Sequence, residues 1–386
     1  MASVVPSWPR RLATTVEPTD VEPTTNPYAP SPFSPDYTAA RRRFRDAAAA
    51  AGARLTQYKH PAPGPDGGGL ATDVAWVGPE GAAAVVVLVS GTHGVEGYCG
   101  SAAQIDWLAR AEAAELPEDA AVLLIHALNP HGFAWDRRVN EDNVDLNRNW
   151  VDFEGRLPRN PHYADIAAAL CPAQWTDASR KATTRELHDY RTQRGLLAFQ
   201  HAVSAGQYEF PDGLFYGGDR PSWSRRTLAA IAAQHLGRAA RVAFIDYHTG
   251  LGPAGFGTRI VAGRPGAPEY LRAAAWWGAG LDSPKAGDSP SADVKGDWLS
   301  SAGDLAPQAE TGGIVLEFGT VPILAVLEAL RASNWLHAHG QPLSGQGDAI
   351  RAAMRAAFDV DHDVWRGMVL GQSLIAVRQA VAAVAG

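Results

Sequence analysis

The sequence predicts an α/β protein with a mostly parallel or mixed central sheet that helices cover on both faces. Apolar runs of strand length alternate along the chain with segments of helical composition. Residues 82–90 (AAAVVVLVS) and 121–128 (AVLLIHAL) are apolar at nearly every position. A strand that is apolar on both faces is typical of a parallel sheet buried between helices.

The predicted elements follow one another in a regular order. Residues 1–36 are rich in Pro, Thr and Ser and should form an irregular arm, and a helix follows from Asp36 to Ala51. Residues 61–69 have the composition of a turn-rich loop. Beyond it we predict strands over 82–90, 121–128, 241–247 and 314–318, helices over 100–114, 227–236 and 324–331, and two further helices between 347 and 385.

Composition limits the possible partners. The 386 residues are 46% hydrophobic, which is enough for a sizeable core, and without a break in composition we expect residues 37–386 to form one domain. The net charge of −7 argues against a nucleic-acid or anionic-membrane partner. Two cysteines, Cys99 and Cys171, are too few for a disulfide framework. We found no targeting segment and no apolar stretch of transmembrane length, so a cytoplasmic protein is expected.

Polar side chains stand at the ends of three predicted strands. His93 comes three residues after the first strand, with Glu96 close behind it, His248 ends the third, and Glu317 lies near the end of the fourth. The carboxyl ends of parallel strands share one edge of a sheet, which predicts that these residues meet there. The His93-x-x-Glu96 pattern alone also suits a loop histidine bonded to backbone, and Glu317 alone suits a structural ion pair.

The residue types fit a catalytic metal centre. Two imidazoles and one carboxylate leave the fourth tetrahedral position of zinc open for water, whose pKa zinc lowers to about 7. A second carboxylate can take a proton from that water and pass it to a leaving amine. Burial of an unpartnered carboxylate is costly, so Glu317 within an apolar run is the candidate for this base.

A second group of motifs resembles a known family. The motifs are Asn129-Pro130-His131-Gly132, Arg138, and Asp145-Leu146-Asn147-Arg148-Asn149-Trp150. They resemble the zinc carboxypeptidases of the carboxypeptidase A type, which carry Asn-Pro-Asp-Gly, then Arg, then Asp-x-Asn-Arg-Asn. The resemblance covers residues 80–320 and keeps the order of all the motifs. It implies one Zn²⁺ per chain, bound by His93, Glu96 and His248.

The resemblance also implies roles for the other motif residues. Arg138 would polarise the scissile carbonyl, and Asn147 and Arg148 would hold a substrate carboxylate. Glu317 would be the base, and Asp145 would orient His93. General chemistry agrees, because arginine offers a planar fork that matches a carboxylate, and zinc-bound histidines usually donate their second N–H to a carboxylate.

The sequence departs from the family pattern in three places. No tyrosine follows Asp297-Trp298, where the family carries a phenol that clamps the substrate, and His131 replaces the usual aspartate. The segment 206–218 is atypical and suggests a bacterial offshoot of the superfamily known only as a domain of unknown function. Tyr208 and Tyr216 in this segment are candidates for the missing phenol, with simple aromatic packing as the alternative.

Two polar residues within strands have competing interpretations. His126 lies in an apolar strand and is predicted to be a core histidine rather than a ligand. Asp246 shares a strand face with His248 by the period of two, so it either orients that histidine or caps a neighbouring loop.

Together these observations predict a zinc-dependent hydrolase of an amide bond next to a free carboxylate. A metallocarboxypeptidase acting on small peptides is the first hypothesis. The alternatives are an N-acyl-amino-acid deacylase of the aspartoacylase or succinylglutamate desuccinylase kind, and a non-catalytic zinc-binding module. The full set of ligands and base argues against the last, because a binding module has no chemical need for all of them.

Overall fold

The computed structural model describes residues 31–110, 112–287, 289 and 291–386. Most of the predicted irregular arm, residues 1–30, lies outside the described residues. Residues Pro32–Gly386 form one unit by their internal contacts. Phe33, near the start of this unit, is already buried in the main hydrophobic core, so the chain is ordered before the first helix begins.

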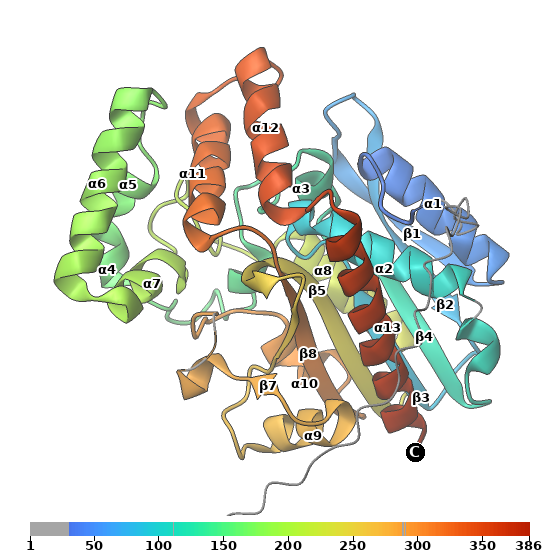
Figure 1. Cartoon of the computed structure of the whole chain (residues 1–386). Coiled ribbons are helices and arrows are strands. Elements are labelled where there is room, and N and C mark those ends of the chain that lie inside the picture. Colours follow the sequence, from blue (N-terminus) through green and yellow to red (C-terminus); the bar gives the residue numbers. More distant parts are fainter. Residues whose placement is uncertain (1–30, 111, 288, 290) are drawn as a thin grey trace, which may run out of the picture. The chain divides into compact units, whose positions relative to one another are not determined.

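The centre of the described part is a mixed sheet with the strand order β1-β2-β4-β3-β5-β8-β6-β7 (Figure 1). The neighbours β4, β3, β5 and β8 are parallel, while β1, β2 and β6 join the sheet in antiparallel pairs. The predicted α/β class with a mixed central sheet is therefore confirmed. The strands are β1 (Arg54–Pro63), β2 (Gly69–Val77), β3 (Ala84–Val89), β4 (Ala120–His126), β5 (Arg241–Ala254), β6 (Gly257–Ile260), β7 (Leu281–Asp282) and β8 (Glu310–Gly319).

Helices cover both faces of this sheet. The larger ones are α1 (Tyr37–Ala50), α2 (Gly97–Ala109), α6 (Asp177–Arg194), α7 (Leu196–Ser204), α8 (Trp223–His235), α9 (Pro268–Trp277), α11 (Ile323–His339), α12 (Gly345–Phe358) and α13 (Asp363–Ala385). The short ones are α3 (Pro130–Ala134), α4 (Pro161–Ala164), α5 (Ala167–Leu170) and α10 (Ala302–Leu305), with 3-10 turns η1 (Gly94–Glu96), η2 (Glu112–Glu115), η3 (Leu146–Arg148), η4 (Pro284–Ala286) and η5 (Leu299–Ser301).

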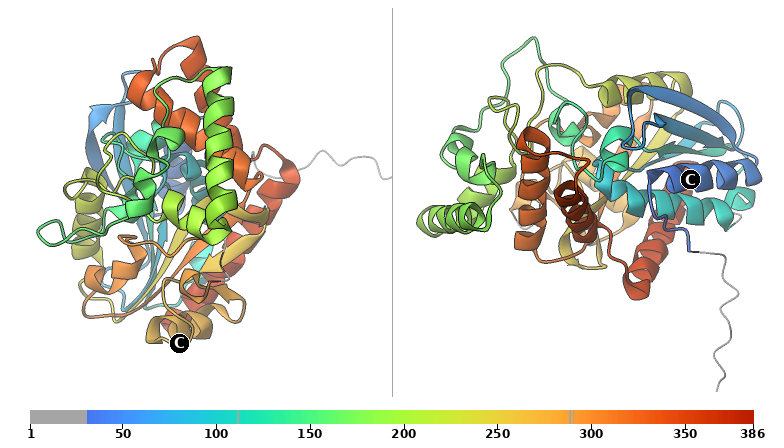
Figure 2. Two further views of the ribbon diagram at one scale, coloured as in Figure 1. Left: turned by 90° about the vertical axis from the view of Figure 1, so that its left-hand side faces the viewer. Right: turned by 90° about the horizontal axis from the view of Figure 1, so that it is seen from above.

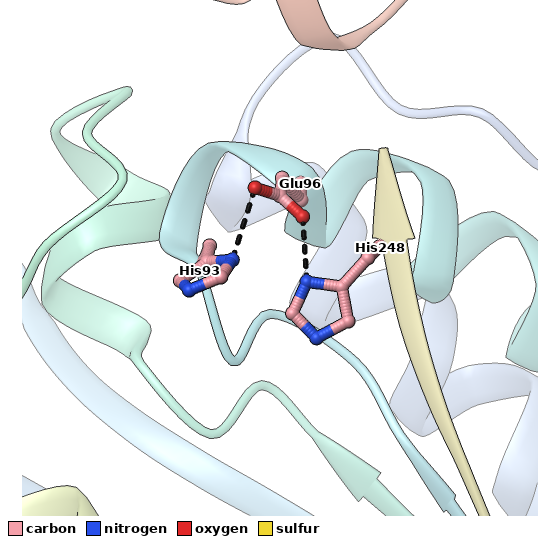
Figure 3. A group of neighbouring side chains, drawn as sticks. All are labelled: His93, Glu96 and His248. Carbon is pink, nitrogen blue, oxygen red and sulfur yellow. Dashed lines mark hydrogen bonds and ion pairs between the residues drawn. The ribbon is translucent and has the colours of Figure 1, made fainter. Parts of the chain in front are cut away.

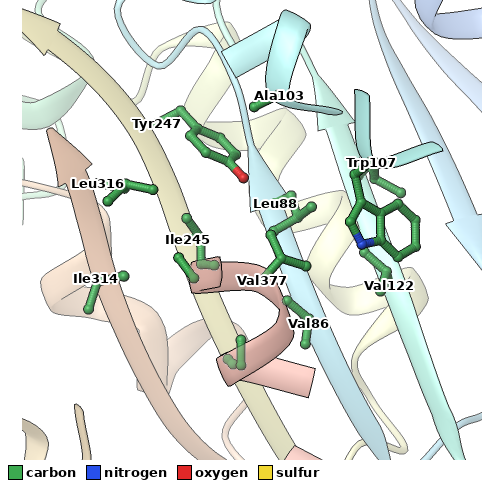
Figure 4. Close-up of a cluster of buried hydrophobic side chains, with 14 of the residues drawn as sticks. Val86, Leu88, Ala103, Trp107, Val122, Ile245, Tyr247, Ile314, Leu316 and Val377 are labelled. Atoms are coloured by element: carbon green, nitrogen blue, oxygen red, sulfur yellow. The ribbon is translucent and has the colours of Figure 1, made fainter. Parts of the chain in front are cut away.

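The period of two along each strand divides the core between the faces. On β3, Val86 and Leu88 point to the side covered by α1, α2, α9 and α13, where Figure 4 shows them beside Val377 of α13. Val85 and Val87 point to the other side, which α8 and α10 cover. Burial on both faces explains why the sequence of β3 is apolar without alternation.

A third hydrophobic cluster joins α4–α7 to α11 and α12. These helices lie beside the sheet (Figure 2). Arg180 of α6 pairs with Glu328 of α11 at 2.8 Å, and this ion pair adds to the apolar contacts. The sequence did not predict α4–α7. Helix α6 buries only Leu187, so it has no apolar stripe to reveal it.

Most predicted elements are present, with shifts at their ends. Helix α1 begins after Asp36, whose side chain accepts a hydrogen bond from the backbone N–H of Ala39 at 2.7 Å. The loop predicted over 61–69 is the connection of a hairpin that the sequence did not predict, since β1 ends at Pro63 and β2 begins at Gly69. Strand β5 continues past Tyr247 to Ala254.

Helix α13 is long and apolar enough to cross a membrane by length and composition alone. The expectation that no stretch has this length was therefore wrong. One face of α13 is buried against the sheet, with Trp365, Val369 and Val377 in the main core. Burial of this face in the core explains why it is apolar.

Candidate active site

The strand ends that the sequence singled out meet at one edge of the sheet. His248 of β5 and Glu317 of β8 are direct partners in the parallel register. His93 follows β3, the other neighbour of β5, and leads into η1 with Glu96. Residues separated by more than two hundred positions are thus brought together by the strand order.

His93, Glu96 and His248 form a buried cluster whose candidate ligand atoms all lie within 4.8 Å of one another (Figure 3). The Nδ1 of His93 lies 3.0 Å from Glu96 Oε1, and the Nδ1 of His248 lies 2.8 Å from Glu96 Oε2. Both imidazoles therefore present the same ring nitrogen to one carboxylate. Two ring nitrogens and a carboxylate oxygen are donors that zinc prefers.

The loop that carries His93 is fixed by close backbone packing. The N–H groups of Gly94 and Val95 donate to the carbonyls of Arg138 and Arg137, at 3.0 and 2.8 Å. A Cβ on Gly94 would lie 2.0 Å from the carbonyl carbon of Gly132, so a larger residue does not fit. The ligand loop and the loop before Arg138 are consequently held as one piece.

Each histidine has a further carboxylate at its Nε2 atom. Asp145 Oδ1 lies 3.1 Å from Nε2 of His93, and Asp246 Oδ2 lies 2.7 Å from Nε2 of His248. Asp246 also accepts hydrogen bonds from Trp298 Nε1 at 2.8 Å and Thr92 Oγ1 at 2.7 Å. Of the two interpretations of Asp246, the geometry therefore supports orientation of His248. The long-range contacts of Trp298 and Thr92 had no signal in the sequence.

Burial and charge act against each other in this cluster. Burial lowers the pKa of His248, but the carboxylates of Asp246 and Glu96 outweigh it and raise that pKa well above its ordinary value. Burial raises the pKa of Glu96, but the two histidines outweigh it and lower the pKa. The cluster thus favours a positive charge between its side chains. The proton on His248 supplies this charge, and a metal ion supplies it when it replaces that proton.

Within the cluster of His93, Glu96 and His248, one buried side-chain nitrogen has no hydrogen bond to a described residue. His93 Nδ1 has no hydrogen-bond partner within the described part of the chain, and its 3.0 Å approach to Glu96 Oε1 is an ion-pair distance only. An unpaired buried nitrogen is costly unless something binds it. A metal ion between these three side chains would satisfy it, so the residues fit zinc.

Glu317 lies in the same region with a different environment. Burial and the negative charge of Glu96 raise its pKa to about 7. Its Oε1 accepts a hydrogen bond from the backbone N–H of Leu251 at 2.9 Å. A carboxyl group with a pKa near neutrality can both accept and donate a proton, which is what a general base that later acts as an acid needs.

Two arginines lie above the ring of Phe215. Their guanidinium carbons are 5.3 Å (Arg138) and 5.5 Å (Arg148) from the ring centroid, which is cation–π distance. Arg138 donates to Glu96 Oε1 at 3.1 Å and to Asp145 Oδ2 at 3.0 Å. The sequence did not single out Phe215, because an aromatic residue in a turn-rich loop has no distinctive pattern.

The guanidinium of Arg148 donates its hydrogen bonds to backbone carbonyls, and its Nη1 also lies 4.0 Å from Asp145 Oδ1. It donates to the carbonyl of Asn147 at 2.9 Å and to that of Ser204 at the end of α7. Its Nε is buried and has no hydrogen-bond partner within the residues described, as is also true of Asn147 Oδ1. Arg148 therefore keeps donor capacity for an anionic ligand.

A cavity of about 880 Å³ connects these groups. His93, His248, Asn147, Arg148, Arg138 and Glu317 line it, whereas Glu96 and Asp145 are not among its lining residues. The predicted site residues thus lie together, with Glu96 and Asp145 behind the histidines that line the cavity.

The two candidates for the missing phenol do not reach this cavity. Neither Tyr208 nor Tyr216 is among its lining residues. The Tyr208 hydroxyl donates to the backbone carbonyl of Arg148, and the Tyr216 carbonyl accepts from the backbone N–H of Asp145 at 2.8 Å. Both tyrosines therefore support the loop that carries Asp145 and Arg148. This structural role fits the interpretation of Tyr208 and Tyr216 as packing residues better than a role as the substrate-clamping phenol.

The chain belongs to the family described as "Protein of unknown function (DUF2817)", which matches residues 33–372. The expectation of a family without an assigned function is thereby confirmed. None of the curated proteins matches the chain.

Several solved structures are similar to this chain. Thrombin activatable fibrinolysis inhibitor is 12% identical over 85% of this chain and 76% of that chain, with a TM-score of 0.46. Carboxypeptidase A from Helicoverpa armigera is 13% identical over 84% and 74%, with a TM-score of 0.45. Succinylglutamate desuccinylase from Chromobacterium violaceum is 16% identical over 82% and 76%, with a TM-score of 0.34.

Proposed function

We propose that this protein is a zinc-dependent hydrolase that cleaves an amide bond next to a free carboxylate, and that it acts as a metallocarboxypeptidase on small peptides. The observation that carries the proposal is that one cavity joins three kinds of group. These are the metal-ligand histidines, a carboxyl group with a pKa near 7, and an arginine with an unpaired donor.

His93, Glu96 and His248 would hold one zinc ion per chain. When bound, zinc acts as a Lewis acid that polarises the scissile carbonyl and makes water a better nucleophile. Asp145 and Asp246 would fix the orientation of the two imidazoles through their Nε2 atoms.

Glu317 would move the proton. Its Oε1 is occupied by the N–H of Leu251, so the other oxygen would take the proton from the attacking water and pass it to the leaving nitrogen. The C–N bond breaks, the hydroxyl of water joins the acyl carbon, and the nitrogen leaves as a free amine.

Arg148 and Asn147 would bind the free carboxylate of the substrate, since Arg148 Nε has no hydrogen-bond partner among the described residues and the side-chain amide of Asn147 can donate from Nδ2. Arg138 would polarise the scissile carbonyl from its place between Glu96 and Asp145. Its two carboxylate partners and Phe215 keep this guanidinium in one position.

Cavity size favours the peptidase over a deacylase for small acyl groups. Ligand pockets have volumes of about 300–1,000 Å³, and this cavity of about 880 Å³ is near the upper end. Residues 250–257 contribute Gly250, Leu251, Gly252 and Ala254 to its lining, and residues 206–218 contribute Phe215. A site for an acetyl or succinyl group would need less space.

The test is a zinc analysis followed by a substrate comparison. The zinc-loaded protein is incubated with tripeptides, dipeptides and N-acetyl or N-succinyl amino acids, and the products are identified by mass. We expect release of the C-terminal residue from tripeptides. Cleavage confined to the small acyl-amino acids would favour the deacylase, and zinc binding without cleavage of any amide would favour the non-catalytic module.

A further inference from the structure

Phe215 has a backbone conformation that is unusual for a large side chain. Its φ of 55° lies in the left-handed region, which favours glycine and is strained for a bulky residue. The backbone N–H of Gln207 donates to the Phe215 carbonyl at 3.1 Å, and the N–H of Gly217 donates to the Gln207 carbonyl at 2.9 Å. These two bonds close the loop over 207–217 and hold Phe215 in this conformation.

The side chain of Phe215 gives this conformation a reason. Phe215 lines the active-site cavity although it is only 7% exposed, and it belongs to the cluster that joins α4–α7 to α11 and α12. A glycine would relieve the backbone strain, but it would remove the ring from below Arg138 and Arg148. Strain of this kind persists where the surrounding structure fixes it, and it gathers at functional sites. The ring is therefore kept at a conformational cost.

The two arginines over the ring carry like charges and repel each other. Two groups counteract this repulsion. Asp145 contacts both arginines, with Oδ2 3.0 Å from Nε of Arg138 and Oδ1 4.0 Å from Nη1 of Arg148. The face of the Phe215 ring attracts both guanidinium groups, whose carbons lie 5.3 and 5.5 Å from its centroid. One carboxylate and one ring thus fix how far apart the two guanidinium groups lie.

We propose that Phe215 is a positioning residue that sets the spacing between Arg138 and Arg148. This spacing determines the distance that the site accepts between the free carboxylate of the substrate and its scissile amide. The proposal rests on the proposed function, in which Arg148 binds the carboxylate and Arg138 polarises the scissile carbonyl. A fixed spacing selects one length for the connection between the amide nitrogen and the carboxylate. In the peptides of the proposed function this connection is the single carbon of an α-amino acid.

The test compares three tripeptides that begin with two alanines and end in glycine, β-alanine or γ-aminobutyrate, so that only this connection changes. With the zinc-loaded wild-type protein, kcat/KM should fall with each added methylene. Phe215→Leu keeps an apolar side chain but removes the ring face. In this variant kcat/KM for the glycine peptide should fall about five- to thirtyfold, and its preference over the β-alanine peptide should shrink toward one.

Three further variants separate positioning from a loss of folding. Phe215→Tyr keeps the ring and should restore most of the activity and of the preference. Phe215→Asn removes the ring but tolerates the left-handed backbone, so it replaces the leucine variant if that protein does not fold. Phe210→Leu is the matched control, because Phe210 belongs to the same loop, packs on Tyr163 and is not among the described residues that line the cavity. An unchanged preference in the folded ringless variants would overturn the proposal, as would an equal loss of preference in Phe210→Leu.

A binding measurement separates this inference from the proposed function. Acetylglycine and acetyl-β-alanine are titrated calorimetrically into the zinc-loaded Glu317→Gln protein, with Phe215 either intact or replaced by leucine. Tighter binding of acetylglycine that Phe215→Leu weakens supports the spacing role even if the wild-type protein cleaves none of the amides. Equal affinities for the two ligands with Phe215 intact overturn it whether or not the protein is a hydrolase.

Discussion

His126, at the end of β4, and His248, within β5, are both buried, yet their surroundings are opposite. His126 of β4 stacks on Phe44 with ring centroids 4.6 Å apart, and its Nε2 lies 2.9 Å from Ser101 Oγ. Burial lowers its pKa to about 3. His248 of β5 lies between the carboxylates of Glu96 and Asp246, which raise its pKa well above the ordinary value despite burial.

The difference shows that burial alone does not separate a core histidine from a candidate metal ligand. Without carboxylates, burial keeps the imidazole neutral and lets it pack like an aromatic residue. With carboxylates on both nitrogens, the same burial creates a site that favours a cation. The sequence-based prediction of His126 as a core histidine is confirmed by its packing.

The comparison predicts its largest effect at Glu317, the partner of His248 in the sheet register. Glu317→Gln keeps the shape of the side chain but cannot accept a proton, so turnover should fall by about 10²–10⁴-fold. Steady-state rates and elemental analysis on the same preparation check this, and the zinc content should not change. Glu310→Gln, on the same strand but half exposed, is the control. Near wild-type turnover in Glu317→Gln would place the base elsewhere.

The next prediction distinguishes the two histidines by the quantity that each substitution changes, zinc affinity or the free energy of unfolding. His248→Ala removes one of three ligands and should weaken zinc binding by more than about 10²-fold, since even a supporting residue costs up to that amount. His126→Ala should keep its zinc and instead lose about 2–5 kcal/mol of unfolding free energy, as for other large-to-small core changes. Competition with a chelator and denaturant unfolding measure the two quantities. Full zinc affinity in folded His248→Ala protein would contradict the ligand assignment.

Substitution of the hydrogen-bond partners of the two histidines should have a smaller effect on zinc affinity. Asp246→Asn should weaken zinc binding by about 10–100-fold, because Asp246 orients His248 and links it to Trp298. Ser101→Ala removes the matching partner of His126 and should leave zinc affinity unchanged. Equal affinities in the two variants would mean that His248 does not depend on Asp246 for its orientation.

The smallest effect concerns the pH dependence of stability. The pKa of His126 is about 3 in the folded protein and about 6.5 in an unfolded chain. As the pH falls below 6.5, the unfolded chain takes up this proton first, so the unfolding free energy decreases toward pH 3. His126→Gln should reduce this slope between about pH 6 and pH 4 by up to about 1.4 kcal/mol per pH unit.

Denaturant unfolding at several pH values measures this slope. His188→Gln, at a side chain that is 62% exposed, is the control and should leave the slope as it is. Part of the slope should remain in every variant, because burial also lowers the pKa of His131 to about 4. An unchanged slope in His126→Gln would show that His126 does not stay neutral in the folded protein.

Much of the fold and site was visible in the sequence because the signals were local. Buried strands such as β3 are continuous apolar runs, and the site residues His93, His248 and Glu317 follow or end such runs in the sequence. The hairpin of β1 and β2 was missed because β1 is mostly exposed and contains Pro61 and Pro63, which are usual only at a sheet edge. Helix α6 was missed because its one buried residue, Leu187, leaves no periodic pattern.

Other parts of the site depend on contacts that no local pattern encodes. Trp298 reaches Asp246 across 52 positions, and Phe215 supports two arginines from a loop. The composition of the cavity wall also required the structure, because Leu196 of α7 and Leu324 of α11 are far apart in the sequence and line one cavity. Pairings of this kind follow from the tertiary fold and not from propensity.

The sheet register that places His248 opposite Glu317 has a consequence for how this family can diversify. Backbone hydrogen bonds between β5 and β8 hold these two residues at a constant separation, so substitutions in the cavity wall leave their spacing intact. Helix α7 belongs to a separate hydrophobic cluster beside the sheet and supplies one part of that wall. Relatives can therefore exchange or reshape this helix to accept other substrates while the reacting groups stay where they are, which makes α7 the natural target for redesigning specificity.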